Sequence, residues 1–597
     1  MPFEPICESW CDLVFPRWSR RDFFGFALIG LAELLIFFNN PGHFFMGDTL
    51  LWMGYRYHSV GEFLKGFVSA DPTLWYRPLA QRTVESVLYP IVGLHVFPYR
   101  LVMFVLFMAC TIAVFLLVEC LTESRRSAWL ATLFFVPNVT HAFTTYDAAF
   151  VPEMVFTLFF IASVIAWVFW LRHGNPKAQI ASAVFFAGSL VSKETAVALP
   201  FTLLVVWLLF PRKDRPGLRS LTPHFAILAM YLILAIGFLH IRDIHIRQLI
   251  DRPGVAGQSG YQLVLGKNVQ ESAGIAFSWA FGIPRGLHGQ WPLRQHWMLR
   301  ALKGIRFLIC VAALLALFTP QRKYLLIGVA WFLIAAAPTL PLLDHFLPYY
   351  LFAPLVGFSI AVGTALDCLY RYCSGLSRSF AVVLCSLLLG LFAVTNAIAA
   401  NDVAKVHSLL GGSAEVAWNG LQDIKALYPS LKPDTTLLIF DEEDTSYYWE
   451  TAHGMLFQMA YDDVSIRTLF ASDGILPSIE AVNSGKALAL KVSGGHLSDI
   501  TSFVKQRPEL LQPHGVGLHY HLEVLKPGVI RIPELKDVTV NVMWAANGLV
   551  EEPFAMAVDS AGQASIPTAK PATYTFVAIQ RIGDPNWVTV SGTIRVP

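Results

Sequence analysis

Several acidic and basic side chains of this sequence lie just beyond the ends of long apolar segments. Asp48 follows the first such segment, residues 22–38, in a glycine-containing turn that also holds His43. An ionisable group at membrane depth is costly, and it is therefore usually functional. A carboxylate in this place can accept a proton from a substrate hydroxyl, with His43 as a substrate contact. The alternative interpretation makes Asp48 the N-cap of a helix that starts at Thr49.

Arg77 is the second candidate, because its planar fork of donors suits a phosphate group. Its neighbours Trp75 and Tyr76 are typical of the headgroup level of a membrane, where aromatic side chains gather. We predict a phosphate contact for Arg77 and substrate contacts for Trp75 and Tyr76. The alternative for Arg77 is a salt bridge to Asp71 or Glu85.

Lys193 and Glu194 are adjacent opposite charges between two short apolar segments. Charges at that depth are costly and rarely serve packing alone. We predict that this pair is functional; the alternative is a local ion pair. Asp147 opens another apolar segment, where the alternative to a functional role is a helix N-cap. Glu62 is a further candidate for substrate contact.

The composition indicates which elements position these groups. Of the 597 residues, 55% are hydrophobic and only 14% are charged, and the mean hydropathy is +0.53. Soluble domains carry roughly 25% charged residues, so the chain is predicted to be an α-helical polytopic membrane protein. The net charge of +2, with no long basic run, gives no indication of nucleic-acid binding.

Eleven apolar segments are predicted to cross the membrane, although several are near the lower length limit. Every alternate connection is short and basic, which places the N-terminus in the cytoplasm and the residues after 400 outside. A signal peptide is disfavoured because the first segment lacks an Ala-x-Ala site. All eight cysteines fall in spans or cytoplasmic segments, so no disulfide framework is expected. The spans are 22–38, 98–120, 127–143, 150–171, 178–192, 195–210, 224–241, 302–318, 324–341, 347–367 and 379–398.

Three regions outside the membrane are predicted beside this domain of residues 1–400. The loop 39–97 contains apolar residues at helical spacing from Leu50 to Phe67, which indicates one interfacial amphipathic helix. The loop 242–299 is basic and aromatic, and loops of that length are usually functional or disordered. Residues 401–515 alternate short strands and helices as a small α/β domain. Residues 516–597 show period-two runs typical of a β-sandwich.

Three motifs resemble membrane glycosyltransferases of the GT-C superfamily. They are Tyr76-Arg77-Pro78-Leu79, the stretch from Gly93 to Val102, and Ser192-Lys193-Glu194-Thr195 with its following Leu199-Pro200. The resemblance is to the O-mannosyltransferase-like and aminoarabinose-transferase-like group, and it covers residues 22 to about 400. Arg100 stands where those proteins usually have histidine.

Two further positions depart from the pattern of this group. Tyr349 occupies a place where relatives carry arginine, which leaves His345 as the nearest cation. We predict a phosphate contact for His345 and a substrate contact for Tyr349, the alternative being a surface turn at Asp344–His345. The Gly-Arg pair that relatives often show near Asp147 is missing.

The resemblance implies a GT-C fold and an inverting transfer of sugar from a polyprenyl phosphate, undecaprenyl or dolichyl, to an acceptor hydroxyl. The acceptor would be protein, glycan or lipid on the outer face of the membrane, as in protein glycosylation or cell-envelope synthesis. Asp48 would be the base, with Asp147 as a second catalytic carboxylate. Lys193 would bind the phosphate as a point charge, and Glu194 would orient it or a neighbouring arginine. Arg77 and Lys193 would stabilise the departing phosphate. No cofactor is obligatory, although some members use a divalent metal. The expected location is a bacterial inner membrane, with the C-terminal domain periplasmic. The alternative is a lipid-linked sugar transporter or flippase, although no clear repeat is seen.

Overall fold

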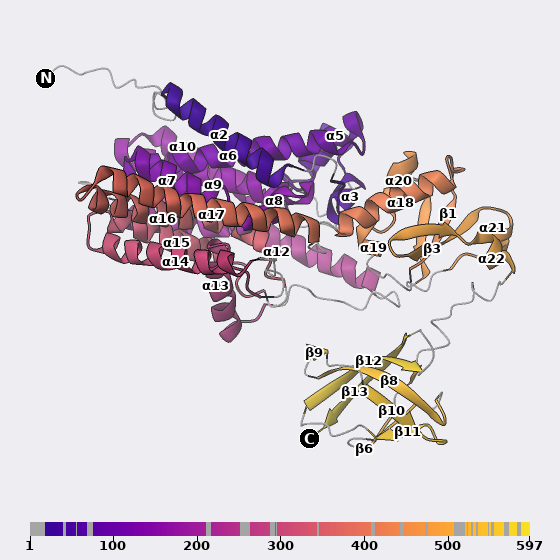
Figure 1. Ribbon diagram of the computed structural model, residues 1–597. Coiled ribbons are helices and arrows are strands. Elements are labelled where there is room, and N and C mark those ends of the chain that lie inside the picture. Colours follow the sequence, from indigo (N-terminus) through magenta and orange to yellow (C-terminus); the bar gives the residue numbers. More distant parts are fainter. Residues whose placement is uncertain are drawn as a thin grey trace. The chain divides into compact units, whose positions relative to one another are not determined.

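The computed structural model is mostly helical (Figure 1). The chain divides into two compact units, which we describe separately. The first comprises residues 1–431, 446–464 and 494–497, and the second the remainder. The structure describes residues 18–596 except 40–42, 55, 69–75, 211–216, 251–262, 287–292, 294, 343–344, 407–411, 442–446, 472–475, 507–510, 512–519, 522, 527–528, 533–534, 547–548, 551–553, 566–571 and 582–586.

Each of the eleven apolar segments coincides with helix in the first unit. Five described helical stretches are long and apolar enough to cross a membrane: Val96–Thr122, Ala148–His173, Leu218–Gly237, Pro348–Ser374 and Arg378–Ala404. The total of eleven spans stays a prediction. The long helices are α2 (Arg20–Phe37), α6 (Val96–Thr122), α7 (Arg125–Phe135), α9 (Val151–His173), α10 (Pro176–Leu190), α11 (Leu199–Leu209), α12 (Thr222–Ile250), α14 (His296–Leu317), α15 (Arg322–Ala336), α16 (Phe352–Ser374) and α17 (Arg378–Val406).

Helix α16 lies at the centre of this bundle. Its most apolar stretch is entirely buried. The helix packs against α7, α14, α15 and α17, which run beside it in Figure 1. Small residues allow the close approach, because a Cβ at Gly357 would lie 2.6 Å from Trp331 and one at Gly328 would lie 2.5 Å from the backbone of Ala361. Interdigitated packing of this kind fixes the helices against one another.

The basic connections at one end of the bundle are tied to buried carboxylates. Arg125 pairs with Asp22 at the start of α2, and Arg126 pairs with the fully buried Asp367 of α16. The Nε of Arg371 donates to the same Asp367 carboxylate at 3.0 Å. Burying a carboxylate is tolerable when cations compensate its charge, so these pairs fix the ends of α2, α7 and α16 together.

The first outside loop differs from its prediction of one amphipathic helix. It contains α3 (Gly47–Gly54), α4 (Val60–Lys65) and α5 (Thr83–Val92). Ser59 starts a new helix by accepting a hydrogen bond from the N–H of Glu62, and the Glu62 carboxylate accepts one from the N–H of His58 at 2.7 Å. These two hydrogen bonds resemble a capping box and mark a helix start within the run of apolar residues, and α4 has no buried residue.

The helices α18 (Ser413–Leu427), α19 (Tyr447–Glu450) and α20 (Met455–Tyr461) also belong to the first unit. They pack against α3. A Cβ on Gly47 would lie 1.8 Å from the Trp449 carbonyl oxygen, and one on Gly54 would lie 2.3 Å from the Met455 sulfur. Both glycines of α3 are therefore sites of close approach to α19 and α20.

The second unit contains short strands and helices, with α21 (Ile479–Asn483) and α22 (Thr501–Gln506). One sheet has the order β2-β1-β3-β4, in which β1 (Thr436–Phe440) pairs in parallel with β2 (Arg467–Phe470) and β3 (Ala487–Ser493). Strand β4 covers His496–Asp499. The domain boundaries at 400 and 515 stay predictions.

The last residues form two antiparallel-rich sheets. The larger has the order β10-β8-β12-β13-β5, with β9 beside β8, and the smaller has the order β11-β7-β6. Alternating apolar residues such as Val540 and Val542 are buried, as the period-two pattern predicts. The strands are β5 (Tyr520–His521), β6 (Glu523–Lys526), β7 (Val529–Arg531), β8 (Val538–Ala546), β9 (Leu549–Val550), β10 (Phe554–Val558), β11 (Gln563–Ser565), β12 (Ala572–Arg581) and β13 (Trp587–Val596).

Candidate active site

Asp48 lies in the first turn of α3, which begins one residue earlier at Gly47. The N-cap interpretation of Asp48 is therefore wrong. The next residue, Thr49, and the N–H of Met46 both donate hydrogen bonds to the carboxylate of Asp147, the latter at 2.7 Å. Asp147 thus ties the start of α3 to the segment before α9 and holds the Asp48 backbone in place.

Both carboxylate oxygens of Asp147 accept hydrogen bonds. One of its oxygens also accepts from the N–H of Ala149 at 2.9 Å, as the N-cap of the short helix η2 (Ala148–Phe150). The N-cap interpretation of Asp147 is thus confirmed. The side chain is buried, whereas Asp48 stays accessible to solvent. Asp48 is consequently the carboxylate of the two that a substrate can reach.

The electrostatic setting of the two carboxyl groups differs from that of free aspartate. Burial raises the pKa of Asp147 to about 6, although its three hydrogen bonds oppose that rise. Asp48 remains accessible but is closely surrounded by protein, and this loss of hydration raises its pKa while the Arg77 charge lowers it. A base needs a pKa close to the working pH, so the rise makes Asp48 a stronger base.

Arg77 forms a two-point ion pair with Glu194. Its Nε donates to Oε2 at 2.7 Å and its Nη2 donates to Oε1 at 2.5 Å. The N–H of Leu79 also donates to the Val191 carbonyl at 3.1 Å, so the backbones of the two motifs lie side by side. The ion pair of Arg77 is therefore with Glu194 rather than with Glu85. Asp71, the other partner that the alternative named, lies outside the described residues.

Lys193 forms a buried ion pair with Glu153 of α9 rather than with its neighbour Glu194. Both side chains are about 3% exposed. The Lys193 ammonium also lies 5.3 Å from the ring centre of Tyr349 and 4.8 Å from that of Tyr350. Aromatic faces attract a cation, so the lysine is held by one carboxylate and two rings of the short helix η5 (Pro348–Leu351).

The remaining predicted residues divide by their position. The Tyr349 hydroxyl lies 3.4 Å from Nε2 of His345, which connects His345 to one of the two rings beside Lys193. Tyr76 donates its hydroxyl to the Phe67 carbonyl at 2.9 Å, next to Arg77. Glu62 lies in the first turn of α4, where its carboxylate accepts from the N–H of His58. Trp75 and Asp344 lie outside the described residues.

His43 is buried rather than open to a substrate. Its ring lies 3.8 Å from the ring of Tyr146, between centres. Burial, together with the positive charge of Arg100, lowers the pKa of His43 to about 3. The ring is therefore neutral at physiological pH. Arg100 itself donates to the carbonyl groups of Phe37, Thr145 and Tyr146, each at 2.8 Å, so it fixes three backbone segments behind the site.

Glu153 and Tyr350 were not predicted as site residues. A signal for Glu153 was present, since an acidic residue near the start of an apolar span needs a partner. Tyr350 gave no such signal, because an aromatic residue beside Tyr349 is equally typical of a membrane interface. Within the described parts of the chain, no three His, Cys, Asp or Glu side chains gather as metal ligands.

The described groups form one charged centre. Four segments distant in sequence supply it: the start of α3, the Arg77 turn, the start of α9 and the Lys193–Glu194 step. A surface-accessible carboxylate that feels the charge of Arg77, together with the nearby fixed cation of Lys193, suits the transfer of a group that leaves as phosphate.

The family comparison agrees with this chemistry. Residues 78–240 match the family of dolichyl-phosphate-mannose-protein mannosyltransferases. The matched segment contains Arg77's neighbour Pro78, Asp147 and the Lys193–Glu194 step. The similarity is to a family of glycosyltransferases that use a lipid-phosphate-linked sugar, and it extends over 163 of the 597 residues.

Solved structures show more distant similarity. ArnT from Cupriavidus metallidurans bound to undecaprenyl phosphate is 13% identical with a TM-score of 0.47, covering 79% of this chain and 93% of that chain. The apo oligosaccharyltransferase of Archaeoglobus fulgidus is 10% identical with a TM-score of 0.45, covering 93% and 76%. The oligosaccharyltransferase AglB of the same organism, with an inhibitory peptide and dolichol-phosphate, is 12% identical with a TM-score of 0.44, covering 97% and 77%. No curated protein sequence matches the chain.

Proposed function

We propose that this enzyme transfers a sugar from a polyprenyl phosphate to an acceptor hydroxyl on the outer side of the membrane, with inversion at the anomeric carbon. The observation that carries this proposal is the assembly of Asp48, Arg77 and Lys193 from separate segments into one centre. The carboxylates of Asp48 and Asp147 are neighbours, and Asp48 is the accessible one. Asp147 is buried, and both of its oxygens accept hydrogen bonds.

The steps follow from these roles. The acceptor oxygen attacks the anomeric carbon while the bond from that carbon to the phosphate oxygen breaks. The hydroxyl proton passes to the Asp48 carboxylate, and the polyprenyl phosphate leaves with the bonding electrons. A single displacement of this kind inverts the anomeric centre. A retaining route through a glycosyl-enzyme needs a second carboxylate as nucleophile, and the hydrogen bonds of Asp147 argue against that role.

Arg77 and Lys193 stabilise the negative charge that grows on the leaving phosphate. Glu194 fixes the plane of the Arg77 guanidinium, and Glu153 with the two tyrosines fixes the Lys193 ammonium. Preorganised charges of this kind need no rearrangement during the reaction. We propose no obligatory cofactor, because Arg77 and Lys193 would supply two cations for the phosphate. Asp147 is a positioning residue in this scheme, and no described feature favours the transporter alternative.

Donor binding tests the proposal. We expect Arg77→Ala and Lys193→Ala to weaken the affinity for undecaprenyl phosphate in lipid nanodiscs by at least tenfold each, since a hydrogen bond to a charged group contributes about 1.5–3 kcal/mol. Lys177→Ala is the matched control, because Lys177 is an exposed lysine at the start of α10. Unchanged affinity in both site variants would overturn the assignment.

A further inference from the structure

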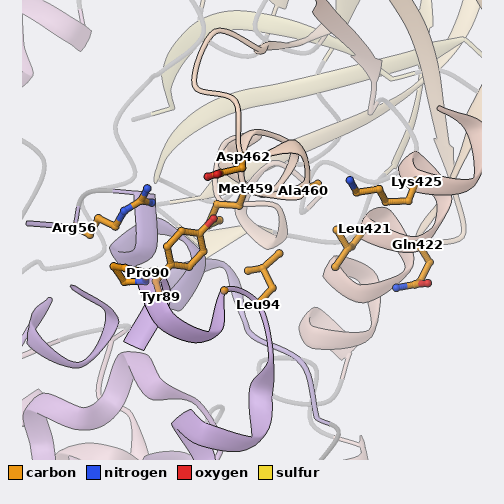
Figure 2. Close-up of a pocket in the computed structure, with 11 residues that line it drawn as sticks. Arg56, Tyr89, Pro90, Leu94, Leu421, Gln422, Lys425, Met459, Ala460 and Asp462 are labelled. Atoms are coloured by element: carbon orange, nitrogen blue, oxygen red, sulfur yellow. The ribbon is translucent and has the colours of Figure 1, made fainter. Parts of the chain in front are cut away.

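A cavity of about 600 Å³ lies next to α3, within the first compact unit (Figure 2). Its volume falls in the range of roughly 300–1,000 Å³ that is typical of small-molecule sites. The chain after α3 and the helices α5, α18 and α20 all contribute to its lining. The lining residues include Arg56, Tyr89, Leu94, Leu421, Lys425 and Asp462.

One wall carries a fixed arginine. The Arg56 guanidinium carbon lies 4.4 Å from the ring centre of Tyr89, and its Nη1 donates to the Met53 carbonyl at 3.3 Å. In Figure 2 the Tyr89 hydroxyl points toward Asp462. A guanidinium stacked on a ring keeps its outward donors in a defined direction.

Asp462 holds an unusual backbone conformation. It is the C-cap of α20 with φ +50° and ψ +38°, in the left-handed region. Glycine is the common residue at such a cap, and a residue with a Cβ is less favourable there. Strained positions of this kind are often retained for function. Here the strain keeps an exposed carboxylate at the cavity.

The opposite wall is α18. Lys425 and Gln422 are exposed side chains of this helix, and the Lys425 ammonium lies 4.0 Å from the ring centre of Tyr461. Leu94, Leu421 and Met459 give the cavity an apolar part. It therefore offers two cations, one carboxylate and one amide around a small apolar surface.

Side chains must perform the recognition, because the walls are helical. Backbone groups within a helix are already paired, so a peptide cannot add there as a strand. Cations suit acid groups, and the carboxylate and amide suit hydroxyl groups. A ligand that carries both kinds of group on a compact ring is a saccharide with carboxylate or phosphate substituents.

We propose that this cavity binds an acidic saccharide, as the part of the acceptor distal to the reacting hydroxyl. The proposal rests on the proposed function. Helix α3 links the two sites, since Asp48 lies in its first turn and Arg56 lies two residues after its end at Gly54. The six-residue step from Asp48 to Gly54 spans roughly 9 Å at a helical rise of 1.5 Å per residue. An oligosaccharide of a few rings reaches from one site to the other.

The test uses the full chain in lipid nanodiscs and three probes of similar length: hyaluronan tetrasaccharide, neutral cellotetraose and tetraglutamate. Protection of Lys425 from acetylation, read by mass spectrometry against the exposed Lys486, locates the bound probe. Calorimetry gives the affinities. Undecaprenyl phosphate binding is measured on the same samples.

We expect hyaluronan tetrasaccharide to protect Lys425 and to bind at least tenfold more tightly than the other two probes. Arg56→Gln and Lys425→Gln should each weaken its binding at least tenfold, and Lys486→Gln should not. Asp462→Gly should raise the melting temperature by relieving strain and still weaken saccharide binding.

Two results would overturn the inference. One is equal or better protection of Lys425 by tetraglutamate or cellotetraose. The other is no protection by hyaluronan tetrasaccharide in protein that still binds undecaprenyl phosphate. Loss of undecaprenyl phosphate binding in the unmodified chain would instead contradict the proposed function.

Discussion

Arg77 and Glu194 are 117 residues apart in the chain and form a two-point ion pair, with N–O distances of 2.7 and 2.5 Å. The pair joins the two motifs that the sequence marks as phosphate-binding. Parallel double hydrogen bonds of this type give direction as well as energy. The guanidinium is therefore oriented before a donor arrives.

The geometry of this pair predicts the result of changing either partner. Arg77→Lys keeps the charge but loses the fork, and we expect at least a tenfold weaker affinity for undecaprenyl phosphate. Glu194→Gln should weaken it less, because the cation remains. The double variant should show a coupling of about 0.5–3 kcal/mol in a double-mutant cycle of binding. Strictly additive effects would show that the two side chains act separately.

Gly47 tests whether the position of α3 matters for transfer. An added Cβ would lie 1.8 Å from the Trp449 carbonyl oxygen, so Gly47→Ala must push α3 away from α19. We expect a lower melting temperature and at least a tenfold lower transfer rate, because Asp48 is the next residue. Gly61→Ala in α4 is the control, since its nearest contact would be Ser59 Oγ at 3.7 Å. Equal behaviour of the two variants would contradict this prediction.

The apolar segments were predictable from the sequence because burial in helices follows hydrophobicity. Charged positions such as Lys193 were also visible, since their cost in an apolar setting demands a reason. Their partners were not predictable. The pairing of Lys193 with Glu153, and of Arg77 with Glu194, depends on how helices cross in three dimensions. The break between α3 and α4 was missed because apolar spacing outweighed the Ser59–Glu62 capping signal.

Asp147 predicts a pH-dependent component of stability. Its pKa is raised to about 6 in the folded chain, from an ordinary value of 3.8. The folded state therefore holds the proton more tightly than the unfolded state, and stability present below pH 3.8 is lost as the pH rises through 6. The loss amounts to about 3 kcal/mol. Asp147→Asn lacks this titration, so its melting temperature should fall less than that of the unmodified chain between pH 4.5 and 7.5. An equal fall in both proteins would assign the effect elsewhere.

The loop charges predict that residues after 400 lie outside the cell membrane. Ser430 is exposed, and the sequence has no cysteine beyond Cys385. Ser430→Cys should therefore label with a membrane-impermeant thiol reagent in intact cells. The unmodified chain, with cysteines predicted in spans or cytoplasmic segments, should stay unlabelled until lysis. Labelling of Ser430→Cys only after lysis would reverse the predicted orientation.

Asp48→Asn tests the catalytic base. Asparagine keeps the shape of the side chain and the first turn of α3, but it cannot accept the hydroxyl proton. We expect normal expression and unchanged binding of undecaprenyl phosphate, with transfer at least about a hundredfold slower, the usual scale for loss of a general base. The measurement uses a radiolabelled polyprenyl-phosphate sugar in nanodiscs.

The pH dependence of transfer separates a base from a structural carboxylate at the same position. Loss of hydration raises the pKa of Asp48, and Arg77 partly offsets the rise. The base must be ionised to act, so the rate in the unmodified chain should climb as the pH increases through that pKa and then level off. Asp48→Asn should lose this limb and leave a flat residual rate. An Asn variant with near-native turnover would reject Asp48 as the base. A retained limb in a slow Asn variant would assign the titration to another group, with Asp147, whose pKa is about 6, the first to examine.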